Sequence, residues 1–132
     1  MGSSYSFMSS DDIQRFINDG RFIIINTMTD HNQSCLIKGT IHSKDESNII
    51  NNIISNKIKK KIIVYGMNWY DQTVYTKFKQ LKKYGFDVYI YSGGIFEWLS
   101  LQDIYGSDEF PTDGKEYDIF KYRPKTNNQF LV

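Results

Sequence analysis

Three short apolar runs constrain the fold of this chain more than any other feature of its sequence. They cover residues 21–26, 62–65 and 87–91 and consist mainly of isoleucine, valine and aromatic residues. The first two are almost uninterrupted by polar side chains, which is typical of strands buried on both faces. Segments of helical periodicity separate the runs, and the connections are compact. This alternation predicts a single α/β domain with a mostly parallel sheet covered by helices on both faces.

Four helices are predicted around these strands. The first covers residues 9–20, where serine hydroxyls and an acidic first turn suit a helix start and a glycine suits its end. The two central helices, residues 46–57 and 73–84, carry apolar side chains at helical spacing. A short fourth helix follows the Ser-Gly-Gly turn at 92–94. Before the second helix, residues 36–42 predict a close approach of the chain followed by a short strand.

Length and composition limit the classes of protein that fit. At 132 residues, with 40% hydrophobic and 16% aromatic side chains, the chain is long enough for one folded core. A formal net charge of +1 gives no support to nucleic-acid binding. The single cysteine, Cys35, excludes an internal disulfide and a multi-cysteine metal cluster. Without a membrane-length apolar stretch or a signal-peptide pattern, we expect a soluble, intracellular, cytoplasmic domain with no integral membrane association.

A strand, a tight loop and a helix follow one another at the centre of the chain. The strand at 62–65 leads into a six-residue loop, and a helix begins at Thr73. Such a junction gathers backbone N–H groups around one point and forms a cradle for an anion. Enzymes that use this cradle place a cysteine at the end of the strand, where the donors and the helix dipole favour the thiolate. Here that position is Gly66, so the nucleophile is missing.

The loop itself allows two interpretations, an inert turn or a recognition surface. Its residues are Gly66, Met67, Asn68, Trp69, Tyr70 and Asp71. The carboxylate of Asp71 or the hydroxyl of Thr73 can cap the N–H groups that would otherwise hold an anion, and a carboxylate there repels one. Trp69 and Tyr70 are either anchors for a protein partner or side chains that fold back onto the helix or the C-terminal tail.

Other chemistry-bearing residues fit structural roles better. Cys35 precedes the close approach at 36–42 rather than the cradle, so no helix start is predicted to lower its pKa, although His31 lies four residues earlier. His31 and His42 lack the partner spacing of a metal site, and none is predicted. The lysines between 57 and 61 suit the end of a helix and its dipole better than a nucleic-acid contact. Trp98 is expected in the core.

The order of these motifs resembles the rhodanese-like domain family. Residues 36–41, Leu-Ile-Lys-Gly-Thr-Ile, are similar to the His-Ile-Pro-Gly-Ala-Ile segment of that family. Tyr-Gly-Phe-Asp-Val-Tyr at 84–89, followed by Gly-Gly-Ile-Phe-Glu-Trp at 93–98, is similar to its closing signature. Residues 22–28 resemble its first core strand, although Asn26 and Met28 replace an acidic and a basic residue.

The resemblance implies a five-stranded parallel sheet with helices on both sides, formed by residues 9–101. Residues 1–8 would be an N-terminal extension, and residues 102–132 a strap across the domain. In active members, the first loop residue is the cysteine that carries a persulfide, and an arginine often closes the loop. Gly66 and Asp71 stand at those two positions, so the resemblance excludes ordinary sulfurtransferase and dual-specificity phosphatase chemistry.

The sequence therefore predicts a protein that is not an enzyme: a non-catalytic rhodanese-like domain that binds or scaffolds an unidentified protein partner without a cofactor. Trp69 and Tyr70 are its candidate binding residues. The alternative is a sulfurtransferase or related enzyme that uses Cys35 or the loop's backbone donors. The AT-biased composition and the tail resemble giant-virus relatives of the family, which would place the protein in an infected cell or a virion. The oligomeric state is left open.

Overall fold

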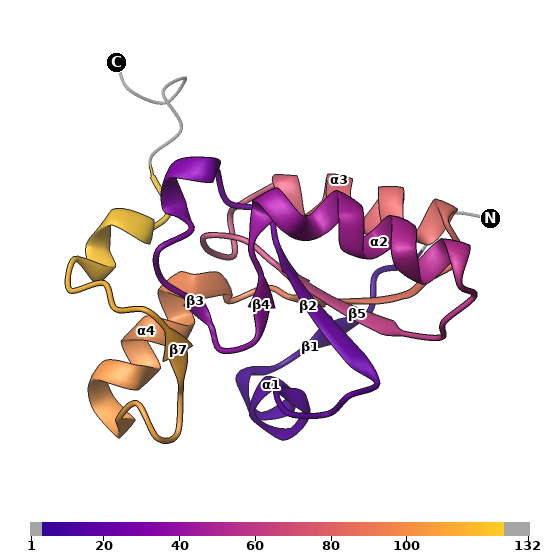
Figure 1. The fold of residues 1–132 in the computed structure, drawn as a ribbon. Helices are drawn as coiled ribbons and strands as arrows, with labels where there is room; N and C mark the ends of the chain where they lie inside the picture. Colours follow the sequence, from indigo (N-terminus) through magenta and orange to yellow (C-terminus); the bar gives the residue numbers. More distant parts are fainter. Residues whose placement is uncertain (1–3, 126–132) are drawn as a thin grey trace, which may run out of the picture.

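The chain forms a five-stranded parallel sheet with the strand order β1-β6-β5-β2-β4 (Figure 1). A computed structural model describes residues 4–125. The strands are β1 (Phe7–Met8), β2 (Phe22–Asn26), β4 (Thr40–Ile41), β5 (Lys61–Tyr65) and β6 (Asp87–Tyr91). Each neighbouring pair is parallel. The predicted α/β fold with a parallel sheet is therefore confirmed, and the sheet also includes Phe7 and Met8, from the predicted N-terminal extension.

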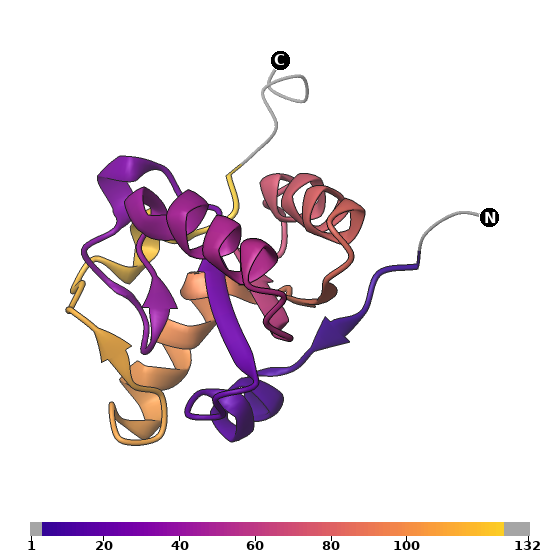
Figure 2. The same cartoon turned by 45° about the vertical axis from the view of Figure 1, so that its right-hand side comes forward.

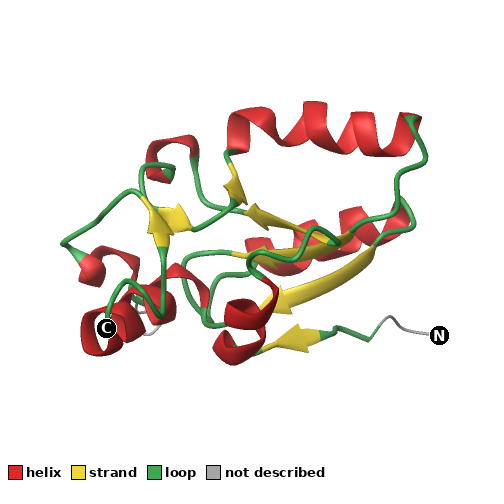
Figure 3. Ribbon diagram, turned by 60° about the horizontal axis from the view of Figure 1, so that its bottom comes forward, coloured by secondary structure: helices red, strands yellow, loops and turns green. Residues whose placement is uncertain are grey.

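Helices cover both faces of the sheet, as Figures 2 and 3 show from two directions. They are α1 (Ser10–Phe16), α2 (Glu46–Ser55), α3 (Thr73–Lys83) and α4 (Gly94–Tyr105). One apolar cluster joins the sheet to α2 and α3, and a second joins its other face to α1 and α4. Within residues 4–125, none of the helices has the length and hydropathy needed to span a bilayer.

Strand β5 lies at the centre of the sheet and contributes to both clusters in turn. Ile62 and Val64 pack against α2 and α3, whereas Ile63 and Tyr65 belong to the opposite cluster. All four side chains are fully buried. Because successive side chains of a strand point to opposite faces, a run of four apolar residues is what a doubly covered strand requires.

Several element boundaries differ from the predicted ones. Helix α1 starts with a capping box between Ser9 and Asp12 but ends at Phe16 rather than Gly20. The amide of Arg21 donates to the Asp19 carboxylate, 2.9 Å away, so β2 begins one residue later than predicted. Helix α2 ends at Ser55, before Lys57 takes a left-handed backbone conformation with φ of 52°. These ends are set by local hydrogen bonds that hydrophobic periodicity does not report.

The segment at 36–42 and the C-terminal tail form a small second sheet together. Strand β3 (Leu36–Ile37) pairs antiparallel with β7 (Thr112–Asp113), while β4 joins the main sheet. Gly39, with φ of 85°, lies between the two strands, where a left-handed conformation favours glycine. The predicted single approach and strand are thus two strands in different sheets.

Residues 106–125 run across the face formed by α4, and residues 126–132 of the predicted strap lie outside the described residues. Helix α4 continues through residue 105 and so crosses the predicted boundary at 101. Phe110 and Tyr122, the latter in a short 3-10 helix (Ile119–Tyr122), are buried. The Trp98 indole donates to the Pro111 carbonyl at 3.0 Å. Trp98 is fully buried, so its expected place in the core is confirmed.

Tyr65 connects the central strand to the small sheet. Its hydroxyl accepts a hydrogen bond from the Ile37 amide at 3.0 Å and lies 2.9 Å from the Thr40 hydroxyl. The ring is completely buried, and this burial raises the pKa of the phenol above its ordinary value. The hydroxyl therefore stays protonated and holds β3 and β4 against the carboxyl end of β5.

We expect Tyr65→Phe to lower the free energy of unfolding by about 1–3 kcal/mol, because it leaves the buried Ile37 amide without its acceptor. Urea unfolding followed by circular dichroism measures the loss. Tyr117→Phe is the matched control, since 88% of that side chain is exposed and no change is expected. Equal stabilities of the two variants would contradict this role.

Candidate functional site

The loop at 66–71 lies at the carboxyl end of β5 and rests on the first turn of α4. The amides of Ile95 and Phe96 donate to the carbonyls of Gly66 and Met67 at 3.0 and 2.9 Å. Gly94 has φ of 67°, and a Cβ atom there would come within 2.6 Å of the Gly66 carbonyl oxygen. This close approach requires glycine. The Gly-Gly segment of the closing signature thus positions the loop.

The carboxylate of Asp71 binds one backbone amide of the loop and the first amide of α3. Its Oδ2 accepts from the Met67 amide at 2.9 Å. Its Oδ1 accepts from the Thr73 amide at 3.0 Å and from the Thr73 hydroxyl at 2.6 Å. The same carboxylate therefore joins the start of α3 to the loop and closes it, so these two amides are engaged within the protein rather than open to an anion.

Gly66 has no space for a side chain in this arrangement. A Cβ atom on Gly66 would lie 2.4 Å from Asp71 Oδ2, 2.8 Å from Thr27 Oγ1 and 2.8 Å from Val74 Cγ2. Gly66 itself is buried. The glycine at position 66 and the inward position of Asp71 are consequently coupled, since the carboxylate fills volume that any side chain at this position would need.

Thr27 belongs to this site, although the sequence reasoning missed it. Its amide donates to the Tyr65 carbonyl at 2.9 Å, and its hydroxyl oxygen lies 2.8 Å from the Thr73 hydroxyl oxygen. The expected parallel sheet could have indicated this position. Strands β2 and β5 are neighbours, with Asn26 opposite Tyr65, so Thr27 and Gly66, which follow these two residues, lie close together. Thr27 thereby joins the ends of two strands and the start of α3.

Asn68 attaches the loop to the C-terminal strap. Its side-chain amide donates to the Tyr122 carbonyl at 2.8 Å, and its carbonyl oxygen accepts from the Tyr70 amide at 2.8 Å. Asn68 is only 7% exposed. No sequence signal could find this link, because its partners lie 54 positions apart.

Trp69 and Tyr70 project from the closed loop. The Trp69 ring lies 5.9 Å from the Phe96 ring, centroid to centroid, so it makes one contact with α4. Even so, 57% of Trp69 and 52% of Tyr70 are exposed. The two side chains form an exposed aromatic surface. The loop that carries them is held by hydrogen bonds from the first turn of α4 and by the bond between Asn68 and the Tyr122 carbonyl.

Beside the loop, Asn26, one of the two positions where the family resemblance places a charged residue, forms a buried pair of amides with Gln33. Asn26 and Gln33 exchange two hydrogen bonds, of 2.9 and 2.8 Å. Asn26 also accepts from the Met28 amide at 3.0 Å, and Gln33 accepts from the Ser43 amide at 3.0 Å. Gln33 was not among the predicted residues. The pair satisfies its own buried polar atoms and fixes the turn after β2 without a net charge.

A groove of about 490 Å³ adjoins Thr27 and Thr73 between α2 and α3. Hydroxyl and amide side chains form most of its lining. The one cation among its described lining residues, Lys77, forms an ion pair of 2.6 Å with Glu46. The groove therefore lacks the unpaired positive charge that an anionic substrate would favour.

Cys35 lies in the core rather than in the cradle. Its side chain is fully buried, with Sγ 3.7 Å from the Gly114 carbonyl oxygen of the strap. Burial raises the pKa of the thiol above its ordinary value. Because the thiolate is the nucleophile, a buried thiol with a raised pKa is unreactive at neutral pH.

The two histidines lie apart from any cluster of ligands. His42 Nδ1 accepts from the Lys44 amide at 3.3 Å and caps a short 3-10 helix, and His31 is exposed. Across residues 4–125, no three His, Cys, Asp or Glu side chains gather closely enough to hold a metal ion.

Solved structures with the same fold cover most of this chain. A yeast protein tyrosine phosphatase of the rhodanese family is 15% identical, with a TM-score of 0.62 over 93% of this chain and 100% of that one. A protein from Anabaena sp. is 16% identical, with a TM-score of 0.61 over 87% and 98%. An As/Sb reductase from Leishmania major is 13% identical, with a TM-score of 0.54 over 79% and 81%. At these identities the likeness shows a shared fold.

A family model assigns the sequence more directly. The model of the rhodanese-like domain matches residues 9–101, which contain the sheet from β2 to β6 and the closed loop. No curated protein matches the chain, and the giant-virus source stays a prediction. The match covers more than half of the chain and includes the motifs that support the loop. The chain belongs to the rhodanese-like domain family.

Proposed function

We propose that this chain is a non-catalytic rhodanese-like domain that binds a protein partner through the surface of its closed loop. The observation that carries the proposal is the position of the Asp71 carboxylate, which accepts hydrogen bonds from the Met67 and Thr73 amides. This carboxylate occupies two hydrogen-bond donors that a reacting anion would use. It also fills the volume that a nucleophilic side chain at position 66 would need.

The residues near the loop support the absence of thiol chemistry. Sulfur transfer through a persulfide requires a reactive thiolate at the cradle, and Gly66 supplies no side chain. Cys35, the single thiol of the chain, is buried in the core, where its pKa is raised. A role for Cys35 would require it to leave that core and to lose its proton in apolar surroundings.

The titles of two structural neighbours, a tyrosine phosphatase and an As/Sb reductase, name enzymes. The corresponding alternative for this chain is an enzyme that uses Cys35 or the backbone donors of the loop. An oxyanion bound at residues 66–71 would have to displace the Asp71 carboxylate or share its donors at close range. Like-charge repulsion in a partly buried loop opposes both.

The exposed face of the loop supports a binding role. Trp69 and Tyr70 are more than half exposed on a backbone held by α4 and by Asn68. Tryptophan and tyrosine are common energetic anchors of protein interfaces. A loop that is already ordered binds with less entropic cost than a flexible one.

The test of the non-catalytic role is a thiosulfate:cyanide sulfurtransferase assay of the purified protein, with Cys35→Ser alongside. We expect no turnover above the uncatalysed rate in either protein, and no sulfur adduct by mass spectrometry. Turnover that survives Cys35→Ser would assign catalysis to the loop donors. Turnover that disappears in that variant would assign it to Cys35, and either result would overturn the proposal.

Gly66→Cys tests whether the cradle is filled. In a Cys35→Ser background we expect this change to lower the free energy of unfolding by about 1–3 kcal/mol, because the new side chain meets Asp71, Thr27 and Val74. Adding Asp71→Ala should restore part of that stability. It should also lower the thiol pKa below its ordinary value of about 8.5, because the Met67 and Thr73 amides become available.

The pH dependence of alkylation measures the thiol pKa, and Asp71→Asn is the matched control because it keeps the volume of the side chain. A stable Gly66→Cys protein with a thiol already reactive at neutral pH would show that the cradle is open, contrary to this structure.

The Trp69→Ala, Tyr70→Ala double variant tests the binding surface. We expect it to recover about tenfold less of a specific partner from an extract of the native host than the wild type does. The control is Tyr105→Ala with Tyr117→Ala, which removes two aromatic side chains that are 63% and 88% exposed elsewhere. Thermal melts of both variants check folding. Equal recovery by the loop variant and the wild type would remove this loop from the interaction.

A further inference from the structure

A second surface lies at the opposite edge of the sheet from the loop. A groove of about 610 Å³ opens between the ends of α2 and α3 and the amino ends of β5 and β6. Apolar side chains line it and remain accessible: Ile54 is 43% exposed, Ile58 42% and Tyr84 58%. The full length of β5 separates this groove from the loop, so the function proposed for the loop does not account for it.

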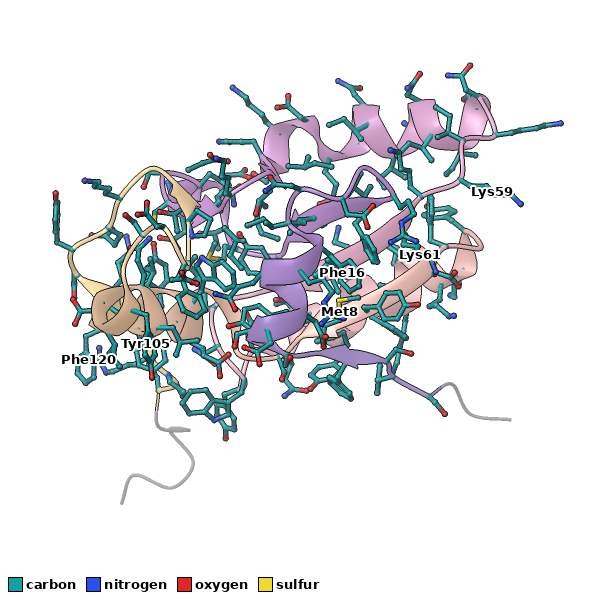
Figure 4. All side chains as sticks on the ribbon, turned by 90° about the horizontal axis from the view of Figure 1, so that it is seen from below. Met8, Phe16, Lys59, Lys61, Tyr105 and Phe120 are labelled. Carbon is teal, nitrogen blue, oxygen red and sulfur yellow. The ribbon has the colours of Figure 1, made fainter. Side chains whose placement is uncertain are left out.

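Positive charge surrounds the apolar lining. Arg21 and the four lysines between residues 57 and 61 line the groove, with Asp87 as the single carboxylate among its described lining residues. Figure 4 shows Lys59 and Lys61 at the end of the molecule away from Tyr105 and Phe120. Exposed apolar side chains bordered by charged ones often mark an interaction site on a protein surface.

Pairing within the protein leaves much of this charge uncompensated. Arg21 forms an ion pair of 2.6 Å with Asp19, and Lys61 lies 3.7 Å from Asp87. Within residues 4–125, no carboxylate pairs with Lys57, Lys59 or Lys60. The Lys60 ammonium donates instead to the Gly20 carbonyl, so Lys57 and Lys59 are the two lysines most available to an anionic partner.

The helix dipole explains only part of the cluster. Helix α2 ends at Ser55, and its field falls off within about one turn. Lys57 lies inside that distance, whereas Lys59 and Lys60 follow in the connection to β5 and exceed what the dipole favours. The helix dipole gives no explanation for the exposed apolar lining formed by Ile54, Ile58 and Tyr84.

We propose that this groove binds an extended peptide segment in which carboxylates alternate with apolar side chains. Side chains of such a peptide point alternately to its two sides. One side can present carboxylates to Lys57 and Lys59, and the other can place apolar groups on Ile54 and Ile58.

The same features fit an acidic peptide better than a nucleic acid. Sequence-tolerant binding of a single strand combines a basic track with several aromatic stacking platforms. In this groove Tyr84 is the one strongly exposed aromatic side chain among the described lining residues, and branched aliphatic side chains form the rest of the accessible apolar surface. The net charge of +1 also gives little long-range attraction for a polyanion.

Fluorescence anisotropy with a labelled octapeptide of alternating Glu and Leu tests the proposal. We expect saturable binding that weakens as salt is raised. Lys57→Glu with Lys59→Glu should raise the Kd at least tenfold, and Ile58→Ser should raise it several-fold. The matched control is Lys44→Glu with Lys115→Glu, which makes the same change in net charge at two exposed lysines outside the groove and should leave the Kd within twofold.

An octapeptide with Gln in place of Glu should bind at least tenfold more weakly. Circular dichroism melts establish that each variant is folded, and Ile54→Ser provides a second apolar variant if Ile58→Ser does not fold. Equal Kd values for the wild type and the lysine variant would overturn the proposal. So would binding to phosphatidylserine vesicles or to an oligothymidylate without binding to the acidic peptide. None of these outcomes depends on Trp69 or Tyr70, so this groove and the loop are tested separately.

Discussion

The hydrogen bonds of the Asp71 carboxylate determine the shape and the chemistry of the loop after β5. A strand end and a helix start bring together N–H groups that need an acceptor. In this protein the acceptor comes from within the loop, at 2.9 Å from the Met67 amide and 3.0 Å from the Thr73 amide. This internal carboxylate engages both amides within the protein, and its negative charge at the start of α3 stabilises the helix.

The rest of the domain supports the loop in this closed form. The first turn of α4 donates two backbone hydrogen bonds to it, and the absence of a side chain at Gly94 lets the two segments touch. Thr27 and Asn68 add contacts from a neighbouring strand and from the strap. What results is a rigid platform from which Trp69 and Tyr70 project. The molecule has two dissimilar ends, an aromatic one at the carboxyl edge of the sheet and a basic, apolar one at the amino edge.

Much of the fold could be predicted from local patterns, and part of the site with it. The runs around Ile24 and Ile63 indicated doubly covered strands because both of their faces are apolar. Gly66 and Asp71 could be placed because a strand, a loop and a helix in succession have one geometry. Helix ends were predicted less well, since bonds such as that of the Arg21 amide to Asp19 decide them. The division of residues 36–42 between two sheets depended on a partner strand more than 70 positions away.

The sequence by itself determined the parallel α/β architecture, the family and the glycine at the end of β5, because each follows from the type and spacing of neighbouring residues. Only the tertiary structure decided that Asp71 fills the cradle, that Cys35 is buried beneath the strap and that Asn68 holds Tyr122. It also brought the lysines after α2 together with Tyr84 around one groove. These outcomes depend on contacts between segments distant in the chain, and such contacts exist only once the sheet has set the distances between them.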